Sequence, residues 1–474
     1  MRIAIVGAGL AGLTTAYELR QAQSGHDVHV DVFEASDRIG GKLFTVPFND
    51  GPVDLGAEAF LARREDALEF FADLGLEQSL VEPSGKSSLV YSGDTLDNLP
   101  RGGVMGIPSS SAPIAHLISE DTAARIDAEK DAEAIDWTPG EDRSIGKLVR
   151  ERYGDEVADR VLSSLLGGVY SCLADDLGIR ATVPQLAEAL DGLAEAGEKV
   201  TLSGAVSKIE QSRPAPTDGP SKPVFNAFSG GYAELYETLA EKSEADIHLD
   251  TFVSGISFDT KTEQYTITGQ GIPGDTEPYD RVVVATPAPT TARLLAKVAP
   301  EAAEALRPVK LASSAVVGLK FDSDDGLPDA SGVLIAADQP GVHAKAFTFS
   351  SKKWPHIKDR IGQGALIRVS FGRFGDDSLA REEEDTLVDY ALDDLHTITG
   401  FDARAAGVSE IYTQRWFGGL PRFDEHHLAT VATVREKIAA QPGLEVTGAW
   451  AGGVGVPAVL ADARAAAWAC ALAG

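Results

Sequence analysis

Residues 2–12, RIAIVGAGLAG, join a short apolar run to three closely spaced glycines. Residues 13–20 have the pattern of a helix, and a second apolar run over residues 28–33 is followed by Glu34. An ordinary strand–helix turn would account for the glycines alone. The full order of strand, turn, helix, strand and acid is typical of a Rossmann-like unit that binds a dinucleotide.

Each glycine of this turn has its own physical task. Gly7 permits the tight turn, Gly9 lets backbone N–H groups approach a pyrophosphate, and Gly12 allows the helix to pack closely on the strand. The N-terminus of the helix favours the phosphate charge. Glu34, 22 residues after Gly12, is placed to accept hydrogen bonds from ribose hydroxyls.

The residues after Glu34 indicate which dinucleotide is bound. Residues 35–42, ASDRIGGK, place the cations Arg38 and Lys42 and the pair Gly40-Gly41 close to the ribose acid. The cations could neutralise a pyrophosphate, and the glycines would allow close backbone approach. A nicotinamide cofactor does not need this second element. We therefore predict FAD, over the alternative of a solvated polar turn.

Composition excludes several classes of function. The chain has 474 residues with 43% apolar and 24% charged, and no apolar stretch is long enough to span a bilayer. A net charge of −30 argues against nucleic acid and against an anionic membrane surface. Two cysteines, Cys172 and Cys470, and nine histidines without metal spacing predict neither a disulfide framework nor a metal site. Because residues 1–6 already read as the first strand, we expect no signal peptide and a cytoplasmic location.

The FAD signals recur near residue 230 and near the C-terminus, which predicts a discontinuous domain. The expected fold is α/β (α+β): a Rossmann-like FAD-binding domain, an inserted antiparallel-sheet substrate domain and a helical lobe. The predicted boundaries are 1–60, 224–300 and 425–474 for the FAD-binding domain, 61–95 and 301–424 for the substrate-binding domain, 96–210 for the helical domain, and 211–223 for a linker loop.

Local patterns support this division. Residues 314–321 and 365–371 alternate like strands of an antiparallel sheet. Residues 145–166 carry apolar side chains at helical spacing, and residues 247–256 form one extended run. Residues 281–284 read as a buried strand that stops before a proline.

With these motifs the chain resembles the flavin-dependent porphyrinogen oxidases of haem biosynthesis, within the amine-oxidase-like flavoprotein superfamily. GAGLAG, EASDRIGGK and GPVDLGAE are shared across the superfamily. The porphyrinogen oxidase pattern itself is carried by LLGGVY (165–170), FTFSSKKWP (347–355), Arg415-Trp416 and GVGVP (453–457). The acidic helical lobe looks more like the bacterial coproporphyrinogen III oxidase branch than like the membrane-bound protoporphyrinogen branch.

The motifs and the resemblance together imply FAD contacts along the whole chain. Val253 ends a predicted strand, where its backbone could read the adenine edge. GVGVP precedes an alanine-rich helix over 458–472, whose dipole would stabilise the reduced flavin. The implied contacts are Gly7, Ala8, Gly9, Leu10, Ala11, Gly12, Glu34, Ala35, Arg38, Gly41, Lys42, Gly56, Ala57, Glu58, Ala59, Val253, Trp416, Gly455, Val456 and Pro457.

The reaction that the resemblance implies is the oxidation of coproporphyrinogen III to coproporphyrin III. Hydride would pass from a meso carbon to the flavin in three rounds, and molecular oxygen would reoxidise the flavin with formation of peroxide. The alternatives are a protoporphyrinogen IX oxidase, more remotely an amine oxidase or carotenoid desaturase, and a non-catalytic flavin-binding scaffold. The resemblance also allows transient contact with the next enzyme of the haem pathway.

An anionic substrate needs cations, and Arg63 and Arg64 are the candidates for substrate binding. The alternative is a solvent-exposed pair before a helix over 65–74, where arginine is disfavoured by the helix dipole. We assign no catalytic base, because the segment 421–427, PRFDEHH, departs from the family pattern. Lys345 is interpreted as a rim or structural residue.

Overall fold

The computed structural model describes residues 1–22, 28–213, 223–274 and 276–472, and the chain forms two compact units. The first unit comprises residues 1–82, 223–310 and 429–474, and the second comprises 83–222 and 311–428. This division differs from the three predicted domains: residues 61–82 belong to the first unit, and the helical segment shares a unit with residues 311–424. Of the predicted linker, residues 211–212 end a helix and residues 214–222 lie outside the described part of the chain.

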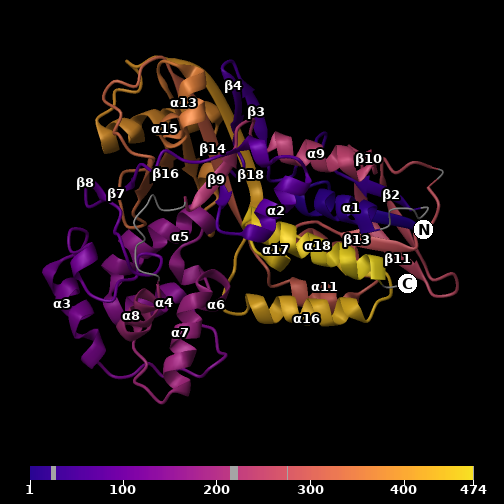
Figure 1. Ribbon diagram of the computed structural model, residues 1–474, viewed down its shortest axis with the longest axis horizontal. Coiled ribbons are helices and arrows are strands. Elements are labelled where there is room, and N and C mark those ends of the chain that lie inside the picture. The colour runs from indigo at the N-terminus through magenta and orange to yellow at the C-terminus, as the bar shows by residue number, and fades with distance from the viewer. Residues whose placement is uncertain (23–27, 214–222, 275, 473–474) are drawn as a thin grey trace. The chain divides into compact units, whose positions relative to one another are not determined.

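The first unit is built on a five-stranded parallel sheet, in the order β10-β2-β1-β13-β19 (Figure 1). Its strands are β1 (Arg2–Val6), β2 (His29–Phe33), β10 (Asp246–His248), β13 (Arg281–Val284) and β19 (Leu444–Val446). All five strands run parallel, so their carboxyl ends meet at one edge, where open α/β sheets bind their ligands. The predicted Rossmann-like fold is confirmed.

Helices cover both faces of this sheet because successive strand residues point to opposite sides. Ile3 and Ile5 pack in one core with three helices, α1 (Leu10–Ala22), α9 (Ala233–Ser243) and α18 (Val456–Leu472). Figure 1 shows α1 beside α18. Ala4 and Val6 pack in the opposite core, with α10 (Ala288–Leu295), α11 (Pro300–Leu306) and α16 (His427–Ala439). Each fully buried isoleucine or leucine contributes about 1.5–3 kcal/mol.

Smaller elements complete the first unit. They are the hairpins β3 (Thr45–Phe48) with β4 (Gly51–Asp54) and β11 (Phe252–Asp259) with β12 (Gln264–Gln270), the group β5 (Phe60–Leu61), β9 (Phe225–Phe228) and β6 (Leu80–Val81), and the helices α2 (Glu65–Asp73) and α17 (Ala449–Gly452).

The extended run predicted over 247–256 is wrong as a single strand. Asp250 has a φ of 51°, and the chain there leaves β10 of the parallel sheet for the hairpin strand β11.

The second unit contains a seven-stranded sheet in the order β18-β14-β17-β16-β15-β7-β8. The predicted strands 314–321 and 365–371 are confirmed within β14 and β17, which pair antiparallel. Its strands are β7 (Ser88–Ser92), β8 (Thr95–Asn98), β14 (Leu311–Phe321), β15 (Gly332–Ile335), β16 (Ala344–Thr348), β17 (Ala365–Phe371) and β18 (Val408–Pro421). Helix α15 (Glu384–Thr399) buries Leu387 and Leu395 against one face of this sheet.

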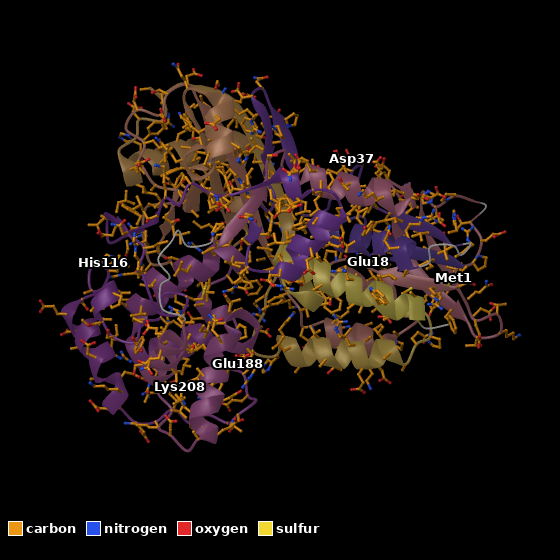
Figure 2. The ribbon with its side chains drawn as sticks, viewed as in Figure 1. Met1, Glu18, Asp37, His116, Glu188 and Lys208 are labelled. Carbon is orange, nitrogen blue, oxygen red and sulfur yellow. The ribbon has the colours of Figure 1, made fainter. Side chains whose placement is uncertain are left out.

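Most of the remaining helices of the second unit form a separate core. They include α3 (Glu120–Ala128), α4 (Ile145–Tyr153), α5 (Ser163–Tyr170), α6 (Ile179–Thr182), α7 (Pro184–Glu195) and α8 (Leu202–Ser212), and α12 (Ser350–Lys353), α13 (Pro355–Ile361) and α14 (Ser378–Arg381) lie elsewhere in the unit. The helix predicted over 145–166 is interrupted at Gly154, which has a φ of 98°. Charged residues such as Glu188 and Lys208 lie on the exposed faces of α7 and α8 (Figure 2). Within the described residues, no helix combines the length and apolarity needed to cross a bilayer.

Candidate functional site

The turn after β1 requires glycine at two positions for reasons internal to the protein. Gly7 has a φ of 107°, and a Cβ atom there would lie 2.8 Å from the carbonyl oxygen of Ala285. A Cβ atom on Gly12 would lie 1.8 Å from the carbonyl oxygen of Gly7. Both substitutions would push backbone atoms apart, so these glycines set the packing of α1 on the sheet.

Gly9 differs from its two neighbours in the motif. Its φ lies outside the left-handed region, and a Cβ atom there would meet Gly41 Cα at an ordinary contact distance of 3.6 Å. The surrounding protein therefore does not demand glycine at this position. Gly9 directly precedes α1, and this 13-residue helix directs its first N–H groups and positive dipole end toward the turn. This is the shape and charge that a pyrophosphate fits.

Glu34 lies at the end of β2, against the first turn. Its Oε2 accepts a hydrogen bond from the Ala8 N–H at 2.9 Å, and its Oε1 accepts from the N–H and Oγ of Ser36 at 2.9 and 2.8 Å. The carboxylate is half-buried and keeps lone pairs for further donors. It is therefore fixed in orientation and suited to ribose hydroxyls. Ala35, next to it, is exposed.

A second glycine loop lies directly on the first. The Gly40 N–H donates to the Ala8 carbonyl at 2.9 Å, and Gly9 and Gly40 form a parallel bridge. Gly41 has a φ of 59°, and a Cβ atom there would lie 2.8 Å from Gly9 Cα. The two loops are thus in backbone contact, which explains the glycine pair that the sequence analysis singled out.

Arg38 and Lys42 have different surroundings in this loop. The Arg38 guanidinium donates to the carbonyls of Ile39, Leu43 and Gly41 at 3.0, 3.2 and 2.8 Å. Burial lowers the pKa of Arg38. These contacts hold the loop in shape.

The Lys42 side chain is exposed to solvent, yet protein atoms crowd its ammonium group. This desolvation, and secondly the Arg38 cation, lower the pKa of Lys42. An ammonium that is crowded and next to a second cation gains by binding an anion.

The segment after β4 adds a third backbone layer. A Cβ atom on Gly56 would lie 2.1 Å from the Lys42 carbonyl oxygen, and the Ala57 N–H donates to that oxygen at 3.4 Å. Glu58 and Ala59 follow and are half-buried. The structure therefore brings three predicted FAD segments, 7–12, 38–42 and 56–59, into one stack.

Val253 lies near the same edge of the sheet. The Thr251 N–H donates to the Glu34 carbonyl at 2.8 Å, and the Asp250 N–H donates to the Ser36 carbonyl at 2.9 Å. Val253 is buried at the start of β11, two residues beyond this contact. The predicted adenine contact is therefore adjacent to the predicted ribose contact.

The C-terminal glycine turn joins β19 to α18. The Gly455 carbonyl accepts from the N–H groups of Ala458 and Val459 at 2.9 and 3.0 Å, and α18 begins at Val456, two residues earlier than predicted. Trp450 donates from its indole N–H to the Thr286 carbonyl at 3.1 Å, at the end of the neighbouring strand β13. Gly455, Val456 and Pro457 thus form the N-terminus of a long helix at the carboxyl edge of the sheet.

The other predicted site residues are described within their own units. Trp416 belongs to the second unit, where it is half-buried on β18 opposite Ser314. Arg63 is exposed, and Arg64 forms a bidentate pair with Asp66 at 2.8 and 2.5 Å that raises the pKa of Arg64.

Lys345 is interpreted from the sequence as a rim or structural residue. Its side chain is buried, which agrees with a structural role and not with a position at the rim. Its Nζ donates to Ser171 Oγ at 2.5 Å and to the Gly372 carbonyl at 3.0 Å. Burial, and secondly the Arg373 cation, lower the pKa of Lys345 to about 7.

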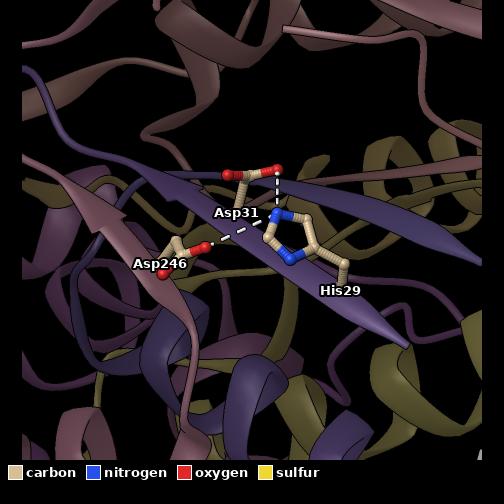
Figure 3. A group of neighbouring side chains, drawn as sticks. All are labelled: His29, Asp31 and Asp246. Carbon is tan, nitrogen blue, oxygen red and sulfur yellow. Dashed lines mark ion pairs between the residues drawn. The ribbon is translucent and has the colours of Figure 1, made fainter. Parts of the chain in front are cut away.

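One cluster of residue types that bind metals lies on β2 and β10 (Figure 3). His29 Nε2 is 3.1 Å from Asp31 Oδ2 and 3.5 Å from Asp246 Oδ2. Histidine and carboxylates are suitable ligands for a divalent ion. The histidine spacing does not predict this cluster, although an aspartate within the buried strand HVDVF is a usable signal.

The buried carboxylate of this cluster already has protein donors. Arg2 Nη2 is 3.0 Å from Asp31 Oδ2, the Tyr279 hydroxyl donates to that same oxygen at 2.9 Å, and His248 Nε2 is 2.8 Å from Asp31 Oδ1. A guanidinium this close opposes a second cation. We interpret the cluster as an ion-pair network that ties β1, β2 and β10 together.

Two further carboxylates shape the site and were not singled out by sequence. Asp54 accepts from Thr45 Oγ at 2.5 Å and from the Tyr232 N–H at 3.0 Å, which joins β4 to the start of α9. Asp462, in α18, accepts from Thr447 Oγ at 2.7 Å. Each is an acid within an apolar or alanine-rich stretch, and this is the signal that could have revealed both.

Comparisons with known proteins agree with this geometry. Residues 10–471 match the sequence family described as flavin containing amine oxidoreductase. The chain is 38% identical to the coproporphyrinogen III oxidase of Mycobacterium tuberculosis H37Rv over 97% of this chain and 95% of the relative. It is 27% identical to the coproporphyrinogen III oxidase of Bacillus subtilis, over 98% and 96% of the two chains.

Solved structures give the same fold. A crystal structure from Exiguobacterium sp. 255-15, provisionally described as a protoporphyrinogen oxidase, superposes with a TM-score of 0.84 and 26% identity over 99% of this chain and 98% of the other. The cyclohexylamine oxidase of Brevibacterium oxydans superposes with a TM-score of 0.65 and 16% identity over 99% and 98%. The second likeness supports the fold alone.

Proposed function

Because the chain belongs to the family of flavin-containing amine oxidoreductases and its cofactor is FAD, we propose that it oxidises coproporphyrinogen III to coproporphyrin III. The proposed electron acceptor is molecular oxygen. Six electrons leave the substrate in three rounds, and each round yields one peroxide. The reaction is a step of haem biosynthesis.

The observation that carries this proposal is the end-to-end similarity to a coproporphyrinogen III oxidase, at 38% identity over 97% of this chain. Full coverage matters because the predicted FAD contacts extend from Gly7 to Pro457. The stack of three glycine segments supports the cofactor assignment independently, since the surrounding protein does not require glycine at position 9, whereas close approach of a pyrophosphate would.

We assign the pyrophosphate to Gly9 and the start of α1, with Lys42 as the neutralising cation and Arg38 as the residue that shapes the loop. Glu34 holds the ribose hydroxyls, in the orientation that Ala8 and Ser36 impose. When bound, FAD supplies the two-electron oxidation. The remaining FAD contacts are assigned to Ala35, Gly41, Gly56, Ala57, Glu58, Ala59, Val253, Trp416, Gly455, Val456 and Pro457.

Aromatisation of the macrocycle drives the reaction, so the chain mainly has to bind and orient the substrate and to exclude water. We assign the carboxylates of the substrate to Arg64, with Arg63 beside it. Arg64 would exchange its bidentate partner Asp66 for a propionate, which has the same chemistry.

The Arg64→Glu variant tests this assignment. Charge reversal should raise KM for coproporphyrinogen roughly tenfold, because one charge-assisted contact is worth about 1.5–3 kcal/mol and the side chain is partly exposed. FAD content should not change. The measurement is steady-state porphyrin fluorescence beside the flavin absorbance of the purified protein, and an unchanged KM would contradict the assignment.

A protoporphyrinogen IX oxidase is the second candidate, because the Exiguobacterium structure with that provisional description superposes over 99% of this chain. The two substrates differ by two propionates against two vinyls. Rates on both porphyrinogens, with oxygen uptake recorded, decide between them. We expect faster turnover of coproporphyrinogen and one oxygen consumed per two electrons. A higher rate on protoporphyrinogen would overturn the substrate assignment.

A further inference from the structure

One carboxylate within α18 is bound to the turn that precedes its own helix. Asp462 is 8% exposed, and its Oδ2 accepts from Thr447 Oγ at 2.7 Å and from the Gly448 N–H at 3.3 Å. Its Oδ1 pairs with Arg435 of α16. A single side chain therefore links the end of β19, the body of α18 and a neighbouring helix.

The turn wraps closely around this carboxylate. Gly448 and Gly453 have φ values of 136° and 128°, which free the backbone to leave β19 sharply and to enter α18. A Cβ atom on Gly452 would lie 2.4 Å from Asp462 Cβ, so the short helix α17 packs directly on it. Thr447 is itself fully buried. The path of the turn from Thr447 to Gly453 is thus defined by contacts with Asp462.

Burying a carboxylate is unfavourable unless donors compensate for the lost water. An apolar residue of similar size would fill the same space without that penalty. The two turn donors, Thr447 and Gly448, both bond to the same oxygen, whereas Arg435 on the other oxygen is 41% exposed at its side chain. The carboxylate is therefore oriented by the turn, and the ion pair is the more peripheral contact.

We propose that Asp462 is a positioning residue for FAD: it holds the turn Thr447–Gly453, and through it the start of α18, in the arrangement that receives the flavin. This inference rests on the proposed assignment of Gly455, Val456 and Pro457 to the FAD site. Asp462 itself does not have to touch the cofactor. It acts by keeping the backbone before Gly455 in one conformation.

The test compares Asp462→Ala with Arg435→Gln, using the full chain stripped of FAD and titrated with FAD while flavin fluorescence is followed. Asp462→Ala leaves two buried donors without their acceptor, and we expect the Kd for FAD to rise about tenfold to hundredfold. Arg435→Gln removes the ion pair but keeps both turn bonds, and its Kd should remain within about threefold of wild type. Thermal unfolding of both apoproteins is recorded in parallel.

Two milder variants keep the test decisive if Asp462→Ala does not fold. Asp462→Asn retains an oxygen for the turn and should recover most of the FAD affinity. Thr447→Val removes one donor without changing the shape and should give an intermediate Kd together with a shifted flavin absorption spectrum. A purely structural role predicts that, in Asp462→Ala and Arg435→Gln alike, FAD affinity falls only in step with thermal stability.

Equal losses of FAD affinity in Asp462→Ala and Arg435→Gln, or an unchanged Kd in Thr447→Val, would overturn the inference. The Gly9→Val variant separates this failure from that of the proposed function. If Gly9→Val loses FAD while the Asp462 variants bind it normally, only the positioning role is wrong. If Gly9→Val also binds FAD normally, the assignment of the FAD site is wrong as well.

Discussion

The two units bring distant chain segments together by opposite means. In the first unit the loops of Gly9 and Gly41 are in backbone contact, so close that a Cβ atom on Gly41 would lie 2.8 Å from Gly9 Cα. In the second unit the buried ammonium of Lys345 joins Ser171, which ends α5, to the carbonyl of Gly372, which follows β17. The contact between Gly9 and Gly41 depends on the absence of side chains, whereas the contact through Lys345 depends on a side chain.

This difference determines how each junction fails. The backbone contact between Gly9 and Gly41 involves no titratable group, so the contact itself is insensitive to pH, but a Cβ atom added to Gly41 disrupts it. The junction through the buried lysine depends on pH, because desolvation disfavours the charged form of its ammonium. Sterically driven and charge-driven variants should therefore separate cleanly between the units.

The largest effect is expected from Gly12→Ala. Its Cβ would lie 1.8 Å from the Gly7 carbonyl oxygen, so α1 and the first turn must move apart. We expect a loss of more than about 3 kcal/mol in the free energy of unfolding, beyond the usual range for overpacking. Chemical unfolding followed by far-UV circular dichroism measures it. A free energy of unfolding like that of wild type would show that the turn adapts to an added carbon. It would contradict the claim that backbone contact limits substitution in the first unit.

Gly9→Val should follow, with loss of the cofactor instead of the fold. The matched variant Gly9→Ala places its Cβ 3.6 Å from Gly41 Cα, which the protein alone accommodates. We expect Gly9→Val to purify as a folded, colourless apoprotein and Gly9→Ala to bind FAD more weakly than wild type. The flavin absorbance of the purified protein, beside its circular dichroism, is the readout. A yellow, oxidase-active Gly9→Val protein is the result that contradicts the FAD assignment.

Lys345→Met probes the charge-driven junction through its pH dependence. Burial lowers the pKa of Lys345 from its ordinary 10.5 to about 7, so between these values the unfolded chain binds a proton that the folded chain has lost. The stability of the wild type should rise with pH over this interval, by up to about 1.4 kcal/mol per pH unit relative to Lys345→Met. This contribution is fully lost once the pH falls below the folded pKa.

Urea unfolding of both proteins at about pH 6.5 and about pH 9 measures this difference. All other titrating groups are common to the two proteins, so they cancel in the comparison. A difference in unfolding free energy that stays constant across the two pH values would show that Lys345 titrates normally. The two junctions would then differ in geometry but not in their dependence on pH.

Lys42→Met should have the smallest effect and sharpens the first half of the comparison. It removes a charge from the glycine stack without adding a carbon to the backbone contact. We expect the Kd for FAD to rise about tenfold, with weaker dependence on salt, and the fold to be retained. Lys208→Met, on an exposed face of α8, is the control and should leave FAD binding unchanged. Equal Kd values for the two variants would exclude Lys42 as a contact to the pyrophosphate.

Features that depend on neighbouring residues could be predicted from the sequence more accurately than features that depend on distant segments. The strands around Gly7 and Val282, the turn glycines and the position of Glu34 were predictable, because apolar runs and glycines act on their immediate neighbours. The single strand expected over 247–256 and the single helix over 145–166 were wrong. In both, a residue with positive φ, Asp250 or Gly154, redirects the chain without disturbing the apolar pattern.

The residues that hold the site together were harder to predict because each acts on a distant segment. Asp462 binds a turn that precedes it, Asp54 binds the start of a helix 178 residues further on, and Lys345 of β16 binds Ser171, which follows α5. Nothing in their local sequence distinguishes a partnered buried charge from a solvated one. Only an unexpected charge within an apolar stretch marks them.

Motifs of adjacent residues are therefore enough to predict the Rossmann-like fold, the choice of FAD and the family. The tertiary structure decided which glycine is required by the protein and which is left open for a ligand. It also decided that Arg38 shapes a loop while Lys42 stays accessible, and that Asp462 fixes the second turn. The physical reason is that steric contact and desolvation depend on neighbours in space, and the chain order does not state them.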